Sequence, residues 1–334
     1  MCTAVTYQTK NFYFGRTLDY EHGFDEELLL TPRGYPLIFR RCGLPAKRYA
    51  ILGMGCIADG YPLYFDGFNE KGLAIAGLNF TDFAHYAPPA EGRDNIAQFE
   101  LIPWILSQCA DLEEASELLA RINITGDDFR PDMPAARLHW LIADKTGAVT
   151  LESTADGLRI HKNPLGVLTN NPPFEIQLLH LANYLQLSPK APENRFSHQL
   201  SLPIISRGMG ALGLPGDLSS QSRFVRAAFS KLNSVSGDSE DDSISQFFHI
   251  LGTVEQISGC CDLGGGQYEK TIYTACCSPE RGIYAYKTYE SHRICAVDMF
   301  LEDLDGKALL HWPPERQMAI EPQNKKALQP APNQ

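Results

Sequence analysis

The sequence has 334 residues, 44% of them hydrophobic, which is enough to bury a substantial core in one large domain or two ordinary ones. Its formal net charge is −11, and its 29 Lys and Arg residues form no basic run, so we expect it to bind neither nucleic acid nor an anionic lipid surface. The apolar run at residues 101–106 is interrupted by Pro103 and is far shorter than the ~20 residues of a membrane-spanning helix. We therefore expect no membrane segment.

Cysteine and histidine spacing gives no sign of a cofactor. The nine cysteines include two adjacent pairs and no C-x-x-C spacing, which favours neither a disulfide framework nor a zinc site. The nine histidines show no ligand grouping, so we expect no metal. A G-x-G-x-x-G pattern at residues 208–213 is followed by Pro215-Gly216 instead of a helix, so it predicts no dinucleotide site. The N-terminal residues lack the features of a secretory signal, and we expect a cytoplasmic protein.

The first expected elements are two strands at residues 3–8 and 12–18. Both are rich in β-branched and aromatic residues, and the connection between them has about the length of a hairpin loop. Cys2 heads the first strand. Arg16 and Asp19 lie at the end of the second, so the hairpin would return both side chains to the end of the sheet that carries Cys2.

The rest of the chain alternates strand groups with helices. Further strands are expected at residues 64–66, 73–79, 138–143, 148–153, 158–161, 268–275, 282–288 and 294–299. Helices are expected at residues 98–109, 220–232 and 243–256, and another after Asp111, which with Glu114 resembles a capping box. The absence of regular βαβ units indicates a layered α+β fold. We expect one domain over residues 1–321 and a frayed tail at 322–334.

Cys2 has a property that no internal cysteine has, because removal of Met1 places an α-amine beside its thiol. An α-amine titrates near ~8, so it can take the thiol proton at neutral pH, and one residue then supplies both nucleophile and base. Asp19 could hold the amine by a charge-assisted hydrogen bond, and Arg16 could favour thiolate over thiol. The alternative is that Cys2 is an accidental second residue and that Arg16 and Asp19 form an exposed pair worth under ~1 kcal/mol.

Three further polar residues are candidates for a functional role. Acyl transfer from an amide needs hydrogen-bond donors aimed at the oxygen that becomes negative. The side-chain amide of Asn170 is such a donor, although an ordinary turn former would also suit the position before Asn171-Pro172. Asn79 ends a predicted strand, where a polar residue is equally ordinary. Arg223 falls in the first turn of a predicted helix, where a cation opposes the helix dipole, and this placement hints at a functional role.

Several segments together resemble the choloylglycine hydrolase family, which comprises bile salt hydrolases and penicillin V acylases. The matching segments, in order over nearly the whole chain, are MCTAVTYQ, FGRTLDY, DGFNEKGLAIAGLNF, GVLTNNPPF, GLPGDLSSQSRFVRAAF and SQFFHILGTVEQ. The resemblance implies the four-layer αββα sandwich of N-terminal-nucleophile hydrolases, no cofactor, a small-molecule substrate and a homo-oligomer, a tetramer by analogy with the family.

The resemblance also implies a set of catalytic residues by motif: Cys2, Arg16, Asp19, Asn79, Asn170 and Arg223. Cys2 would act as nucleophile and base, with Arg16 and Asp19 beside it. Asn79 would supply an oxyanion-hole amide and meet the leaving group. Asn170 would give a side-chain oxyanion donor, although the adjacent Asn171 fits the motif almost as well.

The implied reaction is hydrolysis of glycine- or taurine-conjugated bile salts through a Cys2 thioester. The steroid body would bind in an apolar mouth built from loops, with candidates at residues 23–27, 57–64 and 126–135. Penicillin V acylase activity is the nearest alternative, but family members that act on penicillin often carry Tyr at the place of Asn79. Hydrolysis of N-acyl homoserine lactones is a third option. From other classes, a catalytically silent binding protein or a Cys–His thiol enzyme stays open, although no local motif places a histidine for the latter.

Overall fold

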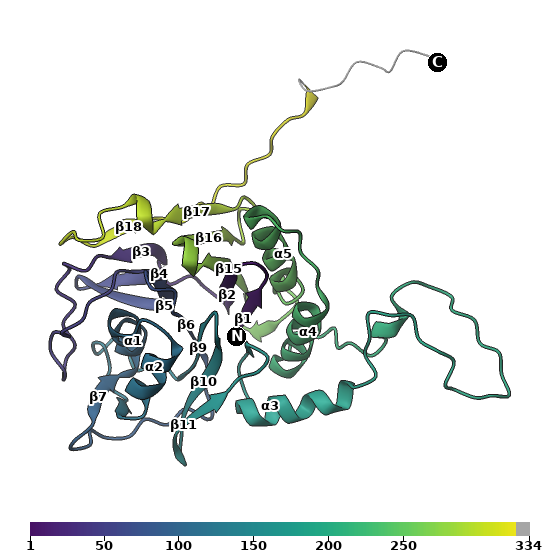
Figure 1. Cartoon of the computed structure of the whole chain (residues 1–334), viewed down its shortest axis with the longest axis horizontal. Helices are drawn as coiled ribbons and strands as arrows, with labels where there is room; N and C mark the ends of the chain where they lie inside the picture. The colour runs from purple at the N-terminus through teal and green to yellow at the C-terminus, as the bar shows by residue number, and fades with distance from the viewer. Residues whose placement is uncertain (325–334) are drawn as a thin grey trace.

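Two large antiparallel sheets lie face to face in the computed structural model, with helices on the outer face of each (Figure 1). The structure describes residues 1–324, so most of the tail expected at 322–334 lies outside the described residues. In this described part no helix is long and apolar enough to cross a membrane. The four layers are helices, sheet, sheet and helices, which confirms the expected αββα sandwich.

The first sheet carries the N-terminal hairpin at its centre. Its strands, in order across the sheet, are β12 (Val167–Leu168), β1 (Cys2–Gln8), β2 (Phe12–Tyr20), β15 (Lys270–Ser278), β16 (Ile283–Thr288) and β17 (Cys295–Asp298). Helices α4 (Ser220–Asn233) and α5 (Glu240–Gly252) pack on its outer face. Since β1 and β2 are covered on both faces, nearly all of their residues are buried, as their apolar and β-branched composition requires.

The second sheet has eight strands. In order they are β11 (Gly157–Lys162), β10 (Gly147–Thr154), β9 (Leu138–Asp144), β6 (Ala74–Asn79), β5 (Tyr61–Asn69), β4 (Ile51–Ala58), β3 (Glu27–Thr31) and β18 (Leu310–Trp312). Helices α1 (Leu101–Gln108) and α2 (Leu112–Leu119) cover its outer face. The molecule has two hydrophobic cores, one between the sheets and one between the second sheet and its helices, and alternate side chains of β6 belong to each. Ala74 and Ala76 face the first sheet, whereas Leu73, just before the strand, and Ile75 face the helices.

Smaller elements complete the chain. They are the parallel pair β7 (Asp94–Ala97) and β8 (Ile122–Thr125), the hairpin β13 (Asp262–Gly264) and β14 (Gln267–Tyr268), and helix α3 (Phe174–His180). Figure 1 shows α3 and a long excursion that follows it on the side of the molecule that carries α4.

Helices α1 and α5 begin at other residues than the sequence predicted, and α5 also ends at Gly252 instead of residue 256. Helix α5 begins at Glu240 instead of residue 243, because Ser239 caps it: the Ser239 side chain accepts from Asp242 N at 3.0 Å and the Asp242 carboxylate accepts from Ser239 N. Residues 98–100 form a short 3₁₀ turn before α1. Asp111 caps α2 as predicted, but the Glu114 carboxylate accepts from Ala110 N, one residue before the cap.

Several strands were not predicted, namely β3, β4, β7, β8, β12, β13 and β18, and β5 is longer than residues 64–66. Glycines obscure the strand pattern in β4 and β5. A Cβ on Gly53 would lie 2.2 Å from the Asp66 carbonyl oxygen, and one on Gly67 would lie 2.7 Å from the Leu52 carbonyl oxygen, so only glycine allows these two strands to approach as they do.

Candidate active site

Strand register places Cys2 and Asp19 together. Cys2 pairs with Leu18 across the β1–β2 hairpin, so Asp19 lies one position further along, beside Met1. Asp19 N donates to the Met1 carbonyl oxygen at 2.9 Å, and the Met1 ammonium donates to the Asp19 carbonyl oxygen at 2.6 Å. The hairpin therefore returns Asp19 to the end of the sheet that carries Cys2, as the sequence predicted.

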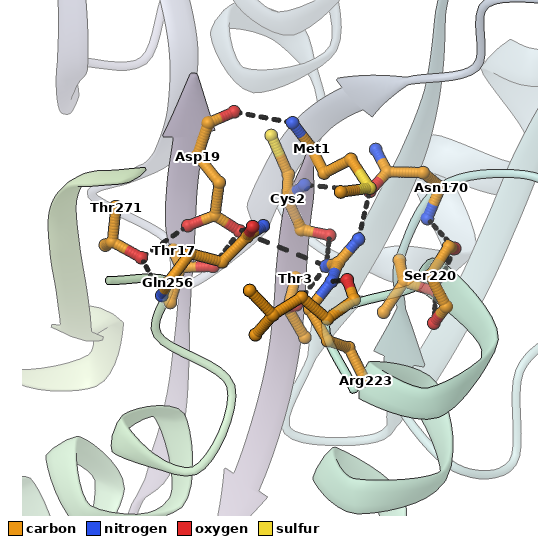
Figure 2. Close-up of polar contacts among 12 residues, drawn as sticks. Met1, Cys2, Thr3, Thr17, Asp19, Asn170, Ser220, Arg223, Gln256 and Thr271 are labelled. Atoms are coloured by element: carbon orange, nitrogen blue, oxygen red, sulfur yellow. Dashed lines mark hydrogen bonds and ion pairs between the residues drawn. The ribbon is translucent and has the colours of Figure 1, made fainter. Parts of the chain in front are cut away.

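The amino terminus is held inside the site while Met1 is attached (Figure 2). Its ammonium also forms an ion pair with Glu269, and burial lowers the pKa of this ammonium below its usual value. Cys2 N is then an ordinary amide that donates to Asn170 Oδ1 at 2.8 Å. Removal of Met1 would turn that nitrogen into an amine at a position where an acceptor already faces it.

Asp19 is fully buried and accepts three side-chain hydrogen bonds. Its donors are Thr271 Oγ1 at 2.6 Å, Thr17 Oγ1 at 3.0 Å and Gln256 Nε2 at 3.2 Å. Arg223 lies 4.0 Å from the same carboxylate. The exposed-pair alternative is therefore wrong for Asp19. Thr271 and Gln256 were not singled out from the sequence, because the pairing of β2 with β15 that brings Thr271 opposite Asp19 joins segments far apart in the chain.

Arg223 ties the nucleophile's strand to the asparagine loop. Its Nη1 donates to the Cys2 carbonyl oxygen at 2.6 Å and to Thr3 Oγ1 at 2.7 Å, and its Nη2 donates to Asn170 Oδ1 at 2.7 Å (Figure 2). Nε donates to the Leu218 carbonyl oxygen at 3.0 Å. The side chain is fully buried, and burial lowers the pKa of the guanidinium. Such a buried, multiply bonded arginine is a structural clamp rather than a solvated surface charge.

Arg16 fills a split in the second sheet. Strands β5 and β6 pair as far as Asp66 and Ala76, and at the next position Arg16 Nη1 donates to both carbonyl oxygens, Gly77 at 2.6 Å and Phe65 at 3.2 Å. Asp66 lies 4.0 Å from Arg16 Nε. Although burial opposes the charge, nearby acidic groups, the Cys2 thiol first among them, raise the pKa of Arg16 above its usual value. A guanidinium fixed in this way is a permanent positive charge beside the thiol.

The backbone N–H of Asn79 faces the same split. Phe80 N donates to the Arg137 carbonyl oxygen, so Phe80 and Arg137 form a hydrogen-bonded pair of the antiparallel ladder. Hydrogen-bonded and non-bonded pairs alternate, so Asn79 and its partner Leu138 form a non-bonded pair. Asn79 N–H therefore points away from β9, toward the side where β5 no longer pairs, and it is available to a ligand.

Asn170 provides a second available donor. Its Nδ2 donates to the Asn79 carbonyl oxygen at 2.8 Å, which uses one of the two hydrogens that a side-chain amide carries. Its neighbour Asn171 instead donates to Asp82 Oδ2 at 3.1 Å. The structure thus brings Asn170, and not Asn171, into contact with Cys2 N and Arg223.

A pocket of about 680 Å³, part of it open to solvent, adjoins this cluster. Cys2, Arg16, Asp19 and Asn79 are among its lining residues, and the others are largely apolar: Leu18, Tyr20, Phe24, Tyr64, Phe65, Gly77, Ala136 and Leu138. Of the predicted mouth segments, 23–27 contributes Phe24 and 57–64 contributes Tyr64, whereas 126–135 ends just before Ala136 and contributes nothing. Among the residues that the structure describes, no group of three or more His, Cys, Asp or Glu is arranged to hold a metal ion.

The fold and the site together define the class of N-terminal-nucleophile amidohydrolases. A thiol at the head of a central strand faces an apolar pocket in an αββα sandwich, with amide donors and a buried carboxylate around it. More particularly, the chain belongs to the choloylglycine hydrolase family of linear amide C–N hydrolases, whose family model matches residues 2–311.

Individual relatives agree with this assignment. A bile salt hydrolase/transferase from Lactiplantibacillus plantarum is 50% identical over 313 residues, which cover 94% of this chain and 97% of the relative. The solved structure of a mutant conjugated bile acid hydrolase from Clostridium perfringens superposes with a TM-score of 0.89 at 36% identity, covering 97% of this chain and 100% of that one. A penicillin V acylase from Agrobacterium tumefaciens shares the fold, with a TM-score of 0.74, 21% identity, and coverage of 93% of this chain and 91% of the acylase.

Proposed function

We propose that the chain, once Met1 is removed, hydrolyses glycine- or taurine-conjugated bile salts through a thioester on Cys2. The observation that carries this proposal is the Cys2 thiol in an apolar pocket, flanked by the donors of Asn79 and Asn170. The names of the relatives support the substrate class, since a 50% identical relative is a bile salt hydrolase/transferase.

The amine of Cys2 serves as the base. Asn170 Oδ1 accepts a hydrogen bond from Cys2 N, which leaves the amine oriented when it becomes terminal. The surroundings that lower the pKa of the Met1 ammonium by burial would act on this amine as well and favour its neutral form. The amine takes the thiol proton, and Arg16 stabilises the thiolate that results.

The thiolate attacks the amide carbonyl, and Asn79 N–H with the free Asn170 amide hydrogen receives the oxyanion. Donors that are fixed before the reaction need no reorganisation, and the loss of one such donor typically raises the barrier by ~3–4 kcal/mol. The ammonium of Cys2 then protonates the departing glycine or taurine nitrogen. Water activated by the same amine hydrolyses the thioester and restores the thiol.

The apolar mouth would bind the steroid body. Phe24 lies against Phe65, with ring centroids 5.6 Å apart, and against Tyr20 at 4.8 Å, so the three rings form one continuous aromatic wall. Burial of an apolar ligand against such a wall contributes roughly 25 cal/mol per Å². The polar end of the substrate would then reach Asn79, which lines the same pocket.

Three alternatives from the sequence can be compared with the site. Penicillin V acylase activity would use the same nucleophile on a different acyl group. A Cys–His mechanism receives no support, because the residues that line the described pocket include no histidine. A silent binding protein would have no use for the buried Asp19 and Arg223 around Cys2.

We also propose self-association, as the family resemblance implies. Between α3 and α4 the chain makes a long excursion that extends away from the sandwich (Figure 1). It exposes several large apolar side chains, namely Leu185, Phe196, Leu200, Leu202, Ile204, Ile205 and Leu212. Burial of these side chains against other copies would supply the association energy.

The test is a comparison of glycocholate, taurocholate and penicillin V with one preparation whose intact mass shows that Met1 is absent. We expect kcat/KM for the better bile salt to exceed that for penicillin V by at least about tenfold, which requires ~1.4 kcal/mol of differential stabilisation. A preference for penicillin V would reject the bile-salt assignment while leaving the amidohydrolase class intact. Cys2→Ala is the control for background hydrolysis.

A further inference from the structure

A buried histidine lies directly behind the two asparagines. His139 on β9 is fully buried, and the ring of Phe80, the residue after Asn79, stacks on its imidazole with centroids 4.3 Å apart and an interplanar angle of 8°. On its other side it contacts Thr169, the residue before Asn170. The ring thus touches the chain next to both oxyanion donors, yet it does not line the pocket.

Both ring nitrogens of His139 face oxygen atoms. Nε2 lies 2.8 Å from the Thr169 carbonyl oxygen, and Nδ1 lies 3.1 Å from Glu152 Oε1. A carbonyl oxygen can only accept, so Nε2 carries a proton. Glu152 is also buried, and its Oε1 accepts from Phe174 N at 2.9 Å. Nδ1 faces the Glu152 carboxylate and can donate to it, in which case both ring nitrogens carry protons.

The other charged groups that the structure describes near His139 and Glu152 do not contact the Thr169 carbonyl. His161 on β11 lies 3.5 Å from Glu152 Oε2, but its Nε2 makes no hydrogen bond. The other nitrogen of His161 lies 3.4 Å from Glu175 of α3, and Glu175 lies 4.0 Å from Arg159. Asp82, in the loop after β6, binds Asn171. Among these groups only His139 contacts the Thr169 carbonyl.

We propose that His139, as an imidazolium paired with Glu152, is a positioning residue that holds the Thr169–Asn170 backbone against Asn79. This inference rests on the proposed function, because it concerns the same oxyanion donors. A charged donor to a carbonyl makes a stronger hydrogen bond than a neutral one, and it fixes the peptide that leads into Asn170. Ser220 Oγ accepts at 2.8 Å from Asn170 N, the N–H of the same peptide, so the Thr169–Asn170 peptide is held at both its carbonyl and its N–H.

Two substitutions of His139 differ in whether the new side chain can still donate to the Thr169 carbonyl. In His139→Gln the side-chain amide can occupy the place of Nε2 and still donate to Thr169, whereas in His139→Asn it reaches only the place of Nδ1 and faces Glu152. We expect kcat for His139→Gln to exceed that for His139→Asn by at least about fivefold, with KM values within about twofold of each other. His161 lies near the same carboxylate but does not contact Thr169, so His161→Gln is the matched control. Its kcat should stay within about twofold of that of the parent.

Nitrogen-15 NMR of histidine-labelled protein gives a readout that does not depend on turnover. We expect one buried imidazole with both nitrogens protonated at neutral pH, and its signals to disappear in His139→Gln. A spectrum with no such ring, or equal kcat in folded Gln and Asn variants, would overturn the inference. If the parent protein fails to cleave bile salts, the proposed function fails, and the spectrum still decides the state of His139. Circular dichroism verifies that each variant is folded.

Discussion

Asp19 shows how one side chain links the strand register to the chemistry. Its carboxylate accepts from Thr271, Thr17 and Gln256 and lies 4.0 Å from Arg223. It therefore balances the charge of a fully buried arginine that itself contacts Cys2. Loss of the charge should disturb the nucleophile even if the shape is retained.

The substitution Asp19→Asn tests this link. In the parent, three side chains donate hydrogen bonds to the Asp19 carboxylate. The Asn side chain replaces one of the two accepting oxygens by an N–H donor, which faces those donors. We therefore expect the free energy of unfolding to fall by about 1–3 kcal/mol. We also expect kcat to fall by at least about tenfold, and by a larger factor than KM rises. Urea denaturation and steady-state kinetics measure the two effects. A variant altered only in KM would move Asp19 from catalysis to substrate binding.

Asn79 is the residue on which we expect substrate choice to depend. It lines the pocket beside Arg16, and its side chain can hydrogen-bond the anionic leaving amino acid. Asn79→Tyr would replace that group by an aromatic face and a more distant hydroxyl. We expect the ratio of kcat/KM for glycocholate to that for penicillin V to fall by about tenfold, mainly through slower bile-salt turnover. An unchanged ratio would show that position 79 does not set specificity.

The sequence predicted the site residues themselves but not the side chains that contact them. Cys2, Arg16 and Asp19 belong to one hairpin, so local pairing alone predicts that they converge. The choice of Asn170 over Asn171 depends on contacts with Cys2 and Arg223, which lie 168 and 53 positions away along the chain. His139 and Glu152 gave no sequence signal, because buried polar residues in an apolar strand look like ordinary interruptions.

The hairpin element is positioned by a close approach between β2 and β15. A Cβ on Gly15 would lie 2.0 Å from the Ala275 carbonyl oxygen and 2.9 Å from a ring carbon of Phe247. The same strand pair brings Thr271 opposite Asp19. Only glycine at position 15 allows both the strand spacing and the packing of α5 on the outer face.

Gly15→Ala should therefore separate β2 from β15. We expect it to lower the free energy of unfolding by more than about 2 kcal/mol, since overpacking of a buried strand commonly costs 1–3 kcal/mol. Gly252→Ala is the matched control, because a Cβ there, in α5, meets nothing within 4 Å and should change stability by less than about 1 kcal/mol. Similar stabilities of the two variants, measured by urea denaturation, would contradict this account of the β2–β15 contact.

Elements with clear periodicity or caps were predictable, and those shaped by glycine were not. The β1–β2 hairpin and α2 follow from local pattern and Asp111. Strand β4 contains Gly53 and Gly55, whose role becomes visible only when the neighbouring strand is in place. The order of strands in both sheets depends on pairings far apart in sequence, which no local pattern specifies.

The whole molecule carries buried thiols that link its stability to alkaline pH. Burial raises the pKa of Cys276 and Cys277 well above the ordinary 9.0, that of Cys56 to about 11 and that of Cys109 to about 12. Above pH 9 the unfolded thiols lose protons that the folded thiols keep, so folding stability falls as pH rises. Lys231 acts in the opposite sense, because burial lowers its pKa to about 8, but the thiols with a raised pKa outnumber it.

We therefore expect the free energy of unfolding to decline from about pH 9 upward when it is measured by urea denaturation in the presence of reductant. In a Cys276→Ala, Cys277→Ala variant the decline should be less steep, whatever the stability at neutral pH. A slope unchanged by the double substitution would show that other groups cause the alkaline loss.

We propose above all that Cys2, as the first residue of the mature chain, is the nucleophile. Of the nine cysteines, Cys260 is the one that is exposed, so it is the natural competitor for an alkylating reagent. A Cys260→Ser variant removes that competitor while leaving the pocket intact.

The most direct test is alkylation of this variant with less than one equivalent of iodoacetamide, followed by mass mapping of the label and an assay of the remaining bile-salt hydrolysis. We predict that the label lies on Cys2 at the start of a chain that lacks Met1, and that the fraction of activity lost equals the fraction of Cys2 labelled. Activity that survives complete labelling of Cys2, or that is lost while Cys2 stays unlabelled, would contradict the account.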